Sequence, residues 1–283
     1  MEVLRTNDEM TKWREERYRQ GQIVGFVPTM GYFHRGHLAL MEEALQRADE
    51  VVVSIFVNPT QFSPGEDLDQ YPRDLERDLK LCRDLGVQAI FAPEVEEMYP
   101  SGFQTRVQVE DLTQNLCGQY RKGHFSGVAL VVTKLFCSIR PHLAVFGEKD
   151  FQQLVVIKRL SKDLNLGVEI VAHPTVREPD GLAMSSRNKY LSAEERNSAL
   201  SLSRSLLAAR DMVAAGERRV DVLLARAKEM IEAEPHTRIQ YVQVVDEETV
   251  TDIDEVTPKA VMAMAVFVGQ ARLIDNMRLW GDS

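Results

Sequence analysis

The first 175 residues alternate short, continuously apolar segments with segments whose apolar residues recur at helical spacing. The clearest apolar run, VVVSIFV at residues 51–57, has no polar alternation, so both faces of the strand it predicts must be covered. Such strands alternating with helices form a parallel sheet with helices on both sides. The pattern therefore predicts an α/β, Rossmann-like domain over residues 1–175. Its expected strands are residues 23–27, 51–57, 87–92, 143–146 and 168–172, and its expected helices are residues 37–48, 75–85, 128–139 and 151–164.

The pattern changes after about residue 175. Two long helical segments and three strand-like segments follow, which predicts a smaller α+β domain over residues 176–283. The connecting loop HPTVREPDGLAMSSRN contains Pro and Gly, and this composition suits a hinge. The expected helices are residues 194–215 and 220–233, and the expected strands are residues 239–245, 260–269 and 271–276.

Charge and cysteine content narrow the class of protein. Lys plus Arg number 34 and Asp plus Glu number 43, giving 34 − 43 = −9, so the chain is a poor candidate for binding nucleic acid. Cys82, Cys117 and Cys137 lack zinc-site spacing, and each is predicted to be a buried, reduced thiol. No apolar run approaches the ~20 residues of a membrane span, and the N-terminus lacks a signal-peptide pattern. We therefore expect a cytoplasmic protein that does not enter a membrane.

The stretch PTMGYFHRGH follows the first predicted strand, at the sheet edge where ligands of parallel sheets bind. If a helix begins near Arg35 or Gly36, its N–H groups and positive dipole end offer an anion site. Three interpretations of His34 and His37 remain: donors to a phosphate, structural side chains, or a metal-binding pair. The metal interpretation is the weakest, because the helical zinc motif spaces its histidines by four with a Glu between them.

Two further segments are rich in anion donors. GEKD contains Lys149 after a predicted strand, and MSSRN contains Ser185, Ser186 and Arg187 in the connecting loop. Alone, each could be a charged turn or a polar capping loop. Together with HRGH in an acidic chain, they favour a phosphate site. Neither GxGxxG nor GxxxxGK[ST] occurs, so a nucleotide must be held in another way.

HxGH followed by a loop of the MSKS type is the signature of the adenylyl-transferring superfamily that includes class I aminoacyl-tRNA synthetases. More narrowly, the chain resembles the pantoate–β-alanine ligase (pantothenate synthetase) family, densely over residues 23–191 and more loosely beyond. Tyr32, Thr60, Lys122 and Ser126 depart from residues common in that family, which affects details of the substrate pocket. The strings that carry the resemblance are PTMGYFHRGH, VSIFVNPTQF, YPRDLERD, GHFSGV, FGEKDFQQL, DGLAMSSRNKYL and ARLIDN.

The resemblance implies a reaction in two steps. ATP activates the carboxylate of (R)-pantoate as pantoyl adenylate with release of pyrophosphate, and the amine of β-alanine then displaces AMP to give pantothenate. It also implies Mg²⁺ and a homodimer. The alternative is that the chain is another HxGH nucleotidyltransferase, one that makes a dinucleotide product. A tRNA synthetase fits poorly because the chain lacks a basic RNA-binding face, and a silent ATP-binding regulator would be expected to have broken motifs.

The resemblance also assigns roles to residues. His34, His37, Lys149, Ser185, Ser186 and Arg187 are the expected catalytic residues. Gln61 and Gln153 are expected to bind pantoate, Gln61 also β-alanine, and Asp78 to lie near Mg²⁺. The expected ATP site comprises Met30, Gly31, Tyr32, Phe33, His34, Arg35, Gly36, His37, Gly147, Glu148, Lys149, Asp150, Val176, Met184, Ser185, Ser186 and Arg187.

Overall fold

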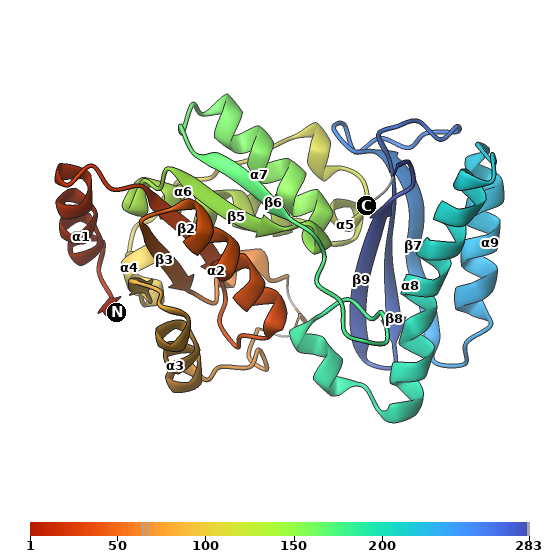
Figure 1. Ribbon diagram of the computed structural model, residues 1–283, viewed down its shortest axis with the longest axis horizontal. Coiled ribbons are helices and arrows are strands. Elements are labelled where there is room, and N and C mark those ends of the chain that lie inside the picture. Colours follow the sequence, from red (N-terminus) through yellow and green to blue (C-terminus); the bar gives the residue numbers. More distant parts are fainter. Residues whose placement is uncertain (64, 67, 282–283) are drawn as a thin grey trace. The chain divides into compact units, whose positions relative to one another are not determined.

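The computed structural model describes residues 1–63, 65–66 and 68–281 (Figure 1). The chain forms two compact units. Unit 1 comprises residues 1–110, 121–148 and 156–174, and unit 2 comprises residues 111–120, 149–155 and 175–283. Two short segments, 111–120 and 149–155, thus group with unit 2 although the sequence around them belongs to unit 1.

Unit 1 is built on a six-stranded, wholly parallel sheet in the order β1-β4-β3-β2-β5-β6, which confirms the predicted fold class. The edge strand β1 was not expected, because only three residues of a polar N-terminus form it by pairing with β4. The strands are β1 (Glu2–Leu4), β2 (Val24–Thr29), β3 (Glu50–Ile55), β4 (Ala89–Phe91), β5 (Leu143–Gly147) and β6 (Glu169–His173).

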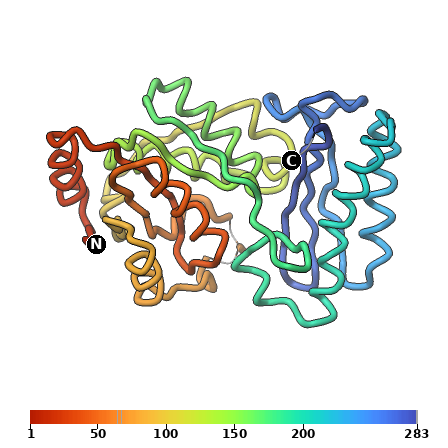
Figure 2. Tube along the Cα trace, viewed as in Figure 1, coloured from red at the N-terminus to blue at the C-terminus, as the bar shows by residue number. Residues whose placement is uncertain are grey.

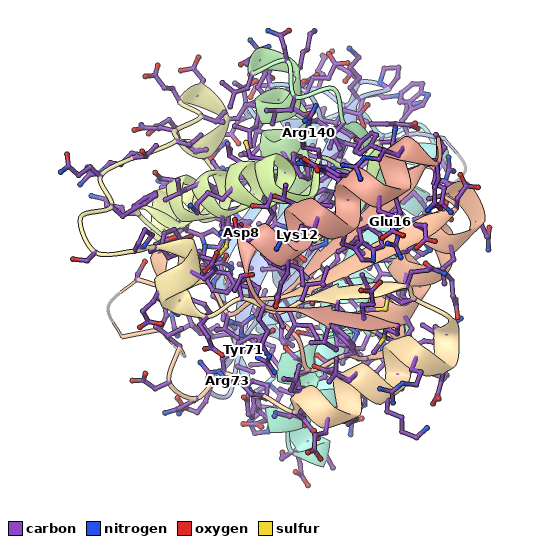
Figure 3. The ribbon with its side chains drawn as sticks, turned by 90° about the vertical axis from the view of Figure 1, so that its left-hand side faces the viewer. Asp8, Lys12, Glu16, Tyr71, Arg73 and Arg140 are labelled. Atoms are coloured by element: carbon purple, nitrogen blue, oxygen red, sulfur yellow. The ribbon has the colours of Figure 1, made fainter. Side chains whose placement is uncertain are left out.

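Helices cover both faces of this sheet. Figure 3, in which Asp8, Lys12 and Glu16 mark α1 (Asn7–Arg19), shows α1 and α6 (His124–Ile139) on one side of the strands and α3 (Leu75–Leu85) on the other. α2 (Arg35–Arg47) packs on α3 and on β2, β3 and β5. The side chains of Val27, Val51 and Val145 are fully buried beneath these helices, as continuous apolar strands require.

The strand order reverses between β2 and β5, which lie side by side with Gly25 opposite Leu143. From β2 the chain passes through α2 to β3 on one side, whereas β5 and then β6 occupy the other side. Such a switch point opens a crevice at the carboxyl ends of the two strands, where ligands of this fold class bind. Met30–His34 and Glu148 directly follow β2 and β5, respectively.

Unit 2 contains an antiparallel sheet in the order β7-β8-β9, packed against two helices (the blue and cyan parts of Figure 2). Its core includes Leu206, Leu223, Met262 and Val266, all fully buried. The elements are α8 (Ala193–Ala214), α9 (Val220–Glu232), β7 (Thr237–Asp246), β8 (Ala260–Val268) and β9 (Ala271–Arg278). The predicted smaller α+β region is therefore confirmed in class.

Shorter elements connect these parts. α7 (Phe151–Asp163) follows β5 and runs from unit 2 into unit 1. The others are η1 (Pro59–Gln61), α4 (Val95–Met98), η2 (Asp111–Thr113), α5 (Cys117–Tyr120), η3 (Glu148–Asp150) and η4 (Ser186–Tyr190).

The three cysteines do not share one environment. Cys82 and Cys117 are buried free thiols, as expected, but the prediction for Cys137 was wrong because its side chain is exposed. Cys137 lies three and four residues after Lys134 and Thr133, on the more polar stripe of α6. In the described ranges, no helix combines the length and the apolar character that crossing a bilayer demands.

Candidate active site

The backbone of the loop between β2 and α2 is hydrogen-bonded to a buried carboxylate. Asp78, on α3, is 1% exposed and accepts the backbone N–H groups of Tyr32 at 2.5 Å and Phe33 at 2.8 Å. Burial raises the pKa of the Asp78 carboxyl, and these two hydrogen bonds oppose that rise. Gly31 and Tyr32 both have positive φ, and a Cβ on Gly31 would lie 3.0 Å from Asp78 Oδ2. Asp78 therefore fixes the loop in a conformation that brings the chain close to α3.

His34 and His37 cap the helix they begin. His34 is the N-cap residue of α2, and its Nδ1 accepts the N–H of Gly36 at 3.1 Å. His37 occupies the third helical position, and its Nδ1 accepts the N–H of His34 at 3.3 Å. An imidazole nitrogen that accepts carries no proton, so each neutral ring has its proton on Nε2. The HxGH pair is therefore a capping box that presents two Nε2–H donors.

This geometry refines the anion site expected from the backbone alone. The N–H of Gly36 is bonded to the His34 ring, and the N–H of His37 is bonded to the His34 carbonyl at 2.9 Å. The two rings lie close together, with centroids 4.1 Å apart and planes tilted by 34°. An anion at this helix terminus would therefore be bound through the imidazole rings, since the N–H groups of Gly36 and His37 are already engaged.

Substitutions of His34 can separate its role in capping α2 from its proposed role in catalysis. Asn is a good N-cap residue without an imidazole, so His34→Asn should keep α2 stable, whereas His34→Ala should cost about 1 kcal/mol of unfolding free energy. Both should lower ATP-dependent activity about a hundredfold, because both lose the Nε2–H donor. Denaturant unfolding and initial rates measure the two effects. Normal activity in His34→Asn would show that the ring only caps the helix.

The residues around Gln61 form a second cluster in unit 1. Asn58, 1% exposed, donates from Nδ2 to Gln61 Oε1 and to the carbonyl of Gly127, both at 3.1 Å. Its Oδ1 accepts the hydroxyl of Tyr99 at 2.8 Å. Gln61 Nε2 in turn contacts Met30 Sδ at 3.3 Å, so the predicted pantoate residue lies beside the predicted ATP loop. Asn58 was missed from the sequence, although Asn-Pro followed by Thr is a typical turn signal.

His124 is hydrogen-bonded to the backbone of the turn that carries Gln61. The guanidinium of Arg121 can only donate, so the 3.0 Å contact from its Nη1 makes His124 Nε2 an acceptor. Nδ1 of His124 then carries the proton and donates to the carbonyl of Gln61 at 2.9 Å. Arg121 also pairs with both oxygens of Glu66 at 2.7 Å. Burial alone would raise the pKa of Glu66, but the paired Arg121 outweighs it and the net pKa is lowered.

Unit 2 carries the other group of predicted residues. Met184 donates its N–H to the carbonyl of Val176 at 2.9 Å, which closes a hairpin that leads into MSSR. Ser185 caps η4 by accepting the N–H of Arg187 at 3.2 Å, and its hydroxyl proton remains available as a donor. Gln153 lies half-buried on α7, whereas its buried neighbour Gln152 bonds the carbonyls of Leu112 and Asn115.

Lys149 lies in unit 2 on η3 and is surrounded by charge. Burial lowers the pKa of its ammonium, Asp150 and Asp275 oppose that change, and Arg187 adds to it. Across the described ranges its ammonium forms no ion pair within 4 Å. A partly desolvated cation next to a second cation is disposed to meet an anion of high charge. Lys149 and Arg187 are thus brought near each other in unit 2, as the phosphate interpretation requires.

The side chains suggest how a metal would have to bind. Within the described residues, no group of three or more His, Cys, Asp or Glu side chains could hold a metal ion. Each oxygen of Asp78 already accepts a backbone N–H. Mg²⁺ commonly uses one or two carboxylates together with substrate phosphates and water. The donor set therefore fits a magnesium ion carried by a nucleotide and does not fit a protein cage.

Known proteins resemble this chain over nearly its whole length. The family described as pantoate-beta-alanine ligase matches residues 2–278. A pantothenate synthetase from Syntrophobacter fumaroxidans is 54% identical over 276 residues, which cover 98% of both chains. The crystal structure of pantothenate synthetase from Thermus thermophilus superposes with a TM-score of 0.94 at 48% identity, covering 99% of this chain and 100% of that one.

A further solved structure carries ligands. The pantoate-beta-alanine ligase from Francisella tularensis, complexed with beta-gamma ATP and beta-alanine, has a TM-score of 0.81 and 32% identity, covering 99% of this chain and 98% of that one. The family match and the fold match therefore both extend along nearly the whole length. This chain belongs to the pantoate–β-alanine ligase family.

Proposed function

We propose that the residues assigned below form the phosphate-handling machinery of an enzyme that joins pantoate to β-alanine. As a family member, the chain is an ATP-dependent, AMP-forming ligase. The observation that carries this function is the family match over residues 2–278 together with 54% identity to a pantothenate synthetase across 98% of both chains.

The chemistry explains why adenylation comes first. An amine cannot displace oxide from a carboxylate, so the carboxylate oxygen of pantoate attacks the α-phosphorus of ATP and pyrophosphate leaves. The amine of β-alanine then adds to the acyl carbon, loses a proton, and expels AMP. Negative charge grows on the phosphate oxygens in the first step, and preorganised donors lower its barrier.

We assign these donors as follows. The Nε2–H groups of His34 and His37 bind phosphate oxygens without changing their protonation state, because Nδ1 of each is committed to capping α2. Lys149 meets the charge on the α-phosphate. Ser185, Ser186 and Arg187 receive the departing pyrophosphate, for which the forked guanidinium of Arg187 is suited. Backbone groups of Met30–His37, Gly147–Asp150, Val176 and Met184 complete the ATP site.

The acceptor site rests on two amides. Gln61 and Gln153 can each donate to and accept from the hydroxyl and carboxylate groups of pantoate, and Gln61 also contacts β-alanine. Asn58 donates to the side-chain amide oxygen of Gln61 and His124 donates to its backbone carbonyl, so both the amide and the turn that carries it are preorganised. An acceptor bearing a phosphate would require additional Arg or Lys side chains in place of these amides.

Magnesium, assembly and location complete the proposal. Mg²⁺ enters with the phosphates of ATP, and Asp78 lies near it on the protein side. We propose a homodimer, for which light scattering should give twice the mass of one chain. The use of ATP and the free thiols support a cytoplasmic location.

Isotope exchange tests the function directly. With pantoate, ATP and Mg²⁺ but no β-alanine, labelled pyrophosphate should enter ATP, and it should fail to do so without pantoate. Addition of β-alanine should yield pantothenate and AMP by mass spectrometry. Folded protein that shows no exchange, or that produces a dinucleotide, would contradict the proposal. Chelation of Mg²⁺ should abolish exchange and excess Mg²⁺ should restore it.

A further inference from the structure

Strand β9 carries two adjacent polar residues, Asp275 and Asn276, on opposite faces of the sheet of unit 2. Asp275 is only 2% exposed and follows Ala271 and Leu273 on the core-facing side. A carboxylate at such a position is costly unless it is paired and hydrogen-bonded. The burial of the Asp275 carboxylate must therefore be compensated by charged and hydrogen-bonding partners.

Arg177 provides the pairing. Its Nη1 donates to Asp275 Oδ2 at 2.7 Å and its Nη2 donates to Oδ1 at 2.9 Å. The backbone N–H of Asn276 also donates to Asp275 Oδ1, at 2.8 Å. The same Nη1 also donates to the carbonyl of Gly181 at 3.1 Å. Arg177 and Gly181 belong to the hairpin closed by Val176 and Met184, which continues into Ser185–Arg187. Asp275 thus fixes the base of the segment that carries Arg187.

Asn276 holds the other cation-bearing segment. Its Nδ2 donates to the backbone carbonyl of Lys149 at 2.9 Å. Lys149 and Arg187 repel each other, since Arg187 lowers the pKa of Lys149. Two like charges stay close only when their backbones are anchored. Asn276 attaches the backbone of Lys149 to β9, and Asp275 attaches the hairpin before Arg187 to the same strand through the side chain of Arg177.

We propose that Asp275 and Asn276 are positioning residues for adenylation, which hold Lys149 and the Arg187-bearing hairpin at the separation that the phosphates of ATP require. This inference rests on the roles proposed above for Lys149 and Arg187. The two residues act through different means. Asp275 contributes charge as well as position, whereas Asn276 contributes position alone.

That difference predicts distinct pH profiles. The charged groups around Lys149 are Asp150, Arg187 and Asp275, with Arg177 bound to Asp275. Asp275→Asn removes an anion that supports the ammonium and leaves Arg177 less compensated. The alkaline limb of kcat/KM for ATP should then move to lower pH by roughly one unit. Asn276→Ala changes no charge, so its limb should stay in place.

The rates should separate positioning from simple destabilisation. Asn276→Ala should lower kcat for pantoate-dependent pyrophosphate exchange about tenfold or more, with little change in KM for pantoate and a folded protein at the assay temperature. Arg278→Gln is the matched control, because Arg278 lies on the same strand in an exposed ion pair with Glu247. Its kcat should equal that of the unmodified chain.

Lys149→Met serves as the reference variant. If Asn276 acts through Lys149, adding Asn276→Ala to Lys149→Met should reduce the rate no further. The inference would be overturned if Asn276→Ala lowered the exchange rate by the same factor in the unmodified chain and in Lys149→Met. A normal kcat in Asn276→Ala would overturn it as well. If Asp275→Asn fails to fold, the comparison of Asn276→Ala in the unmodified and Lys149→Met backgrounds still tests the inference. Normal exchange in Lys149→Met itself would instead refute the role of Lys149 and leave these two residues without a partner in catalysis.

Discussion

Lys149→Ala should lower the rate of pantoate-dependent ATP–pyrophosphate exchange by about a hundred- to a thousandfold, while the protein remains folded. In the proposed mechanism Lys149 contributes its ammonium to the phosphates in the transition state, and loss of one preorganised donor has this order of effect. Its backbone carbonyl, which Asn276 binds, is unchanged by the substitution, so η3 should keep its place. Single-turnover formation of the adenylate measures the step directly. Near-normal turnover in a folded variant would remove Lys149 from its assigned role.

The lowered pKa of Lys149 adds a second signature. Burial is the main cause of the shift, so the ammonium loses its proton at a lower pH than an exposed lysine does. Activity should therefore fall as pH rises through this lowered pKa. In the window between the lowered pKa and the ordinary one, the unfolded chain holds more protons than the folded chain, so stability should rise with pH. Opposite trends of activity and stability would identify this group, and Lys149→Ala should abolish the stability trend.

The sequence was a good guide wherever a local pattern determined the structure. Continuous apolar runs specified the parallel strands, because a strand buried on both faces leaves no room for polar alternation. The position of HRGH after β2 and GEKD after β5 then followed from the rule that ligands bind beyond strand ends, and both lie beside the switch point. The structure shows the structural role of the two histidines, whose Nδ1 atoms cap α2, and their phosphate-binding role stays a prediction.

The supporting residues were not predictable in this way. Asp78 meets the backbone of Tyr32 across 46 residues, and Asp275 meets Arg177 across 98 residues. An isolated acidic residue on a helix or strand reads as a surface group, because nothing nearby in sequence shows that tertiary folding buries it with a partner. The grouping of residues 111–120 and 149–155 with unit 2 depends on such long-range contacts as well. Sequence patterns therefore predicted which groups react, whereas the structure showed the contacts that hold them.

Gly127→Ala should be among the most damaging single substitutions in unit 1. A Cβ at this position would lie 2.2 Å from the carbonyl oxygen of Thr60 and 2.6 Å from the backbone nitrogen of Gln61. These are backbone atoms, so the clash can be relieved only by separating α6 from η1. That movement would also break the bond from Asn58 to the Gly127 carbonyl. We expect a loss of about 1–3 kcal/mol in unfolding free energy, as overpacking usually costs.

The same movement should reach the acceptor site. Gln61 lies at the end of η1, and Asn58 and His124 hold it only while the turn stays against α6. KM for pantoate should therefore rise by about tenfold or more, because a polar group displaced by an ångström no longer meets its partner. Gly147→Ala is the control for stability, since its Cβ would meet nothing nearer than Leu40 Cδ2 at 4.0 Å. A Gly127→Ala protein with unchanged stability and unchanged KM would mean that the close packing of α6 on η1 has no part in binding pantoate.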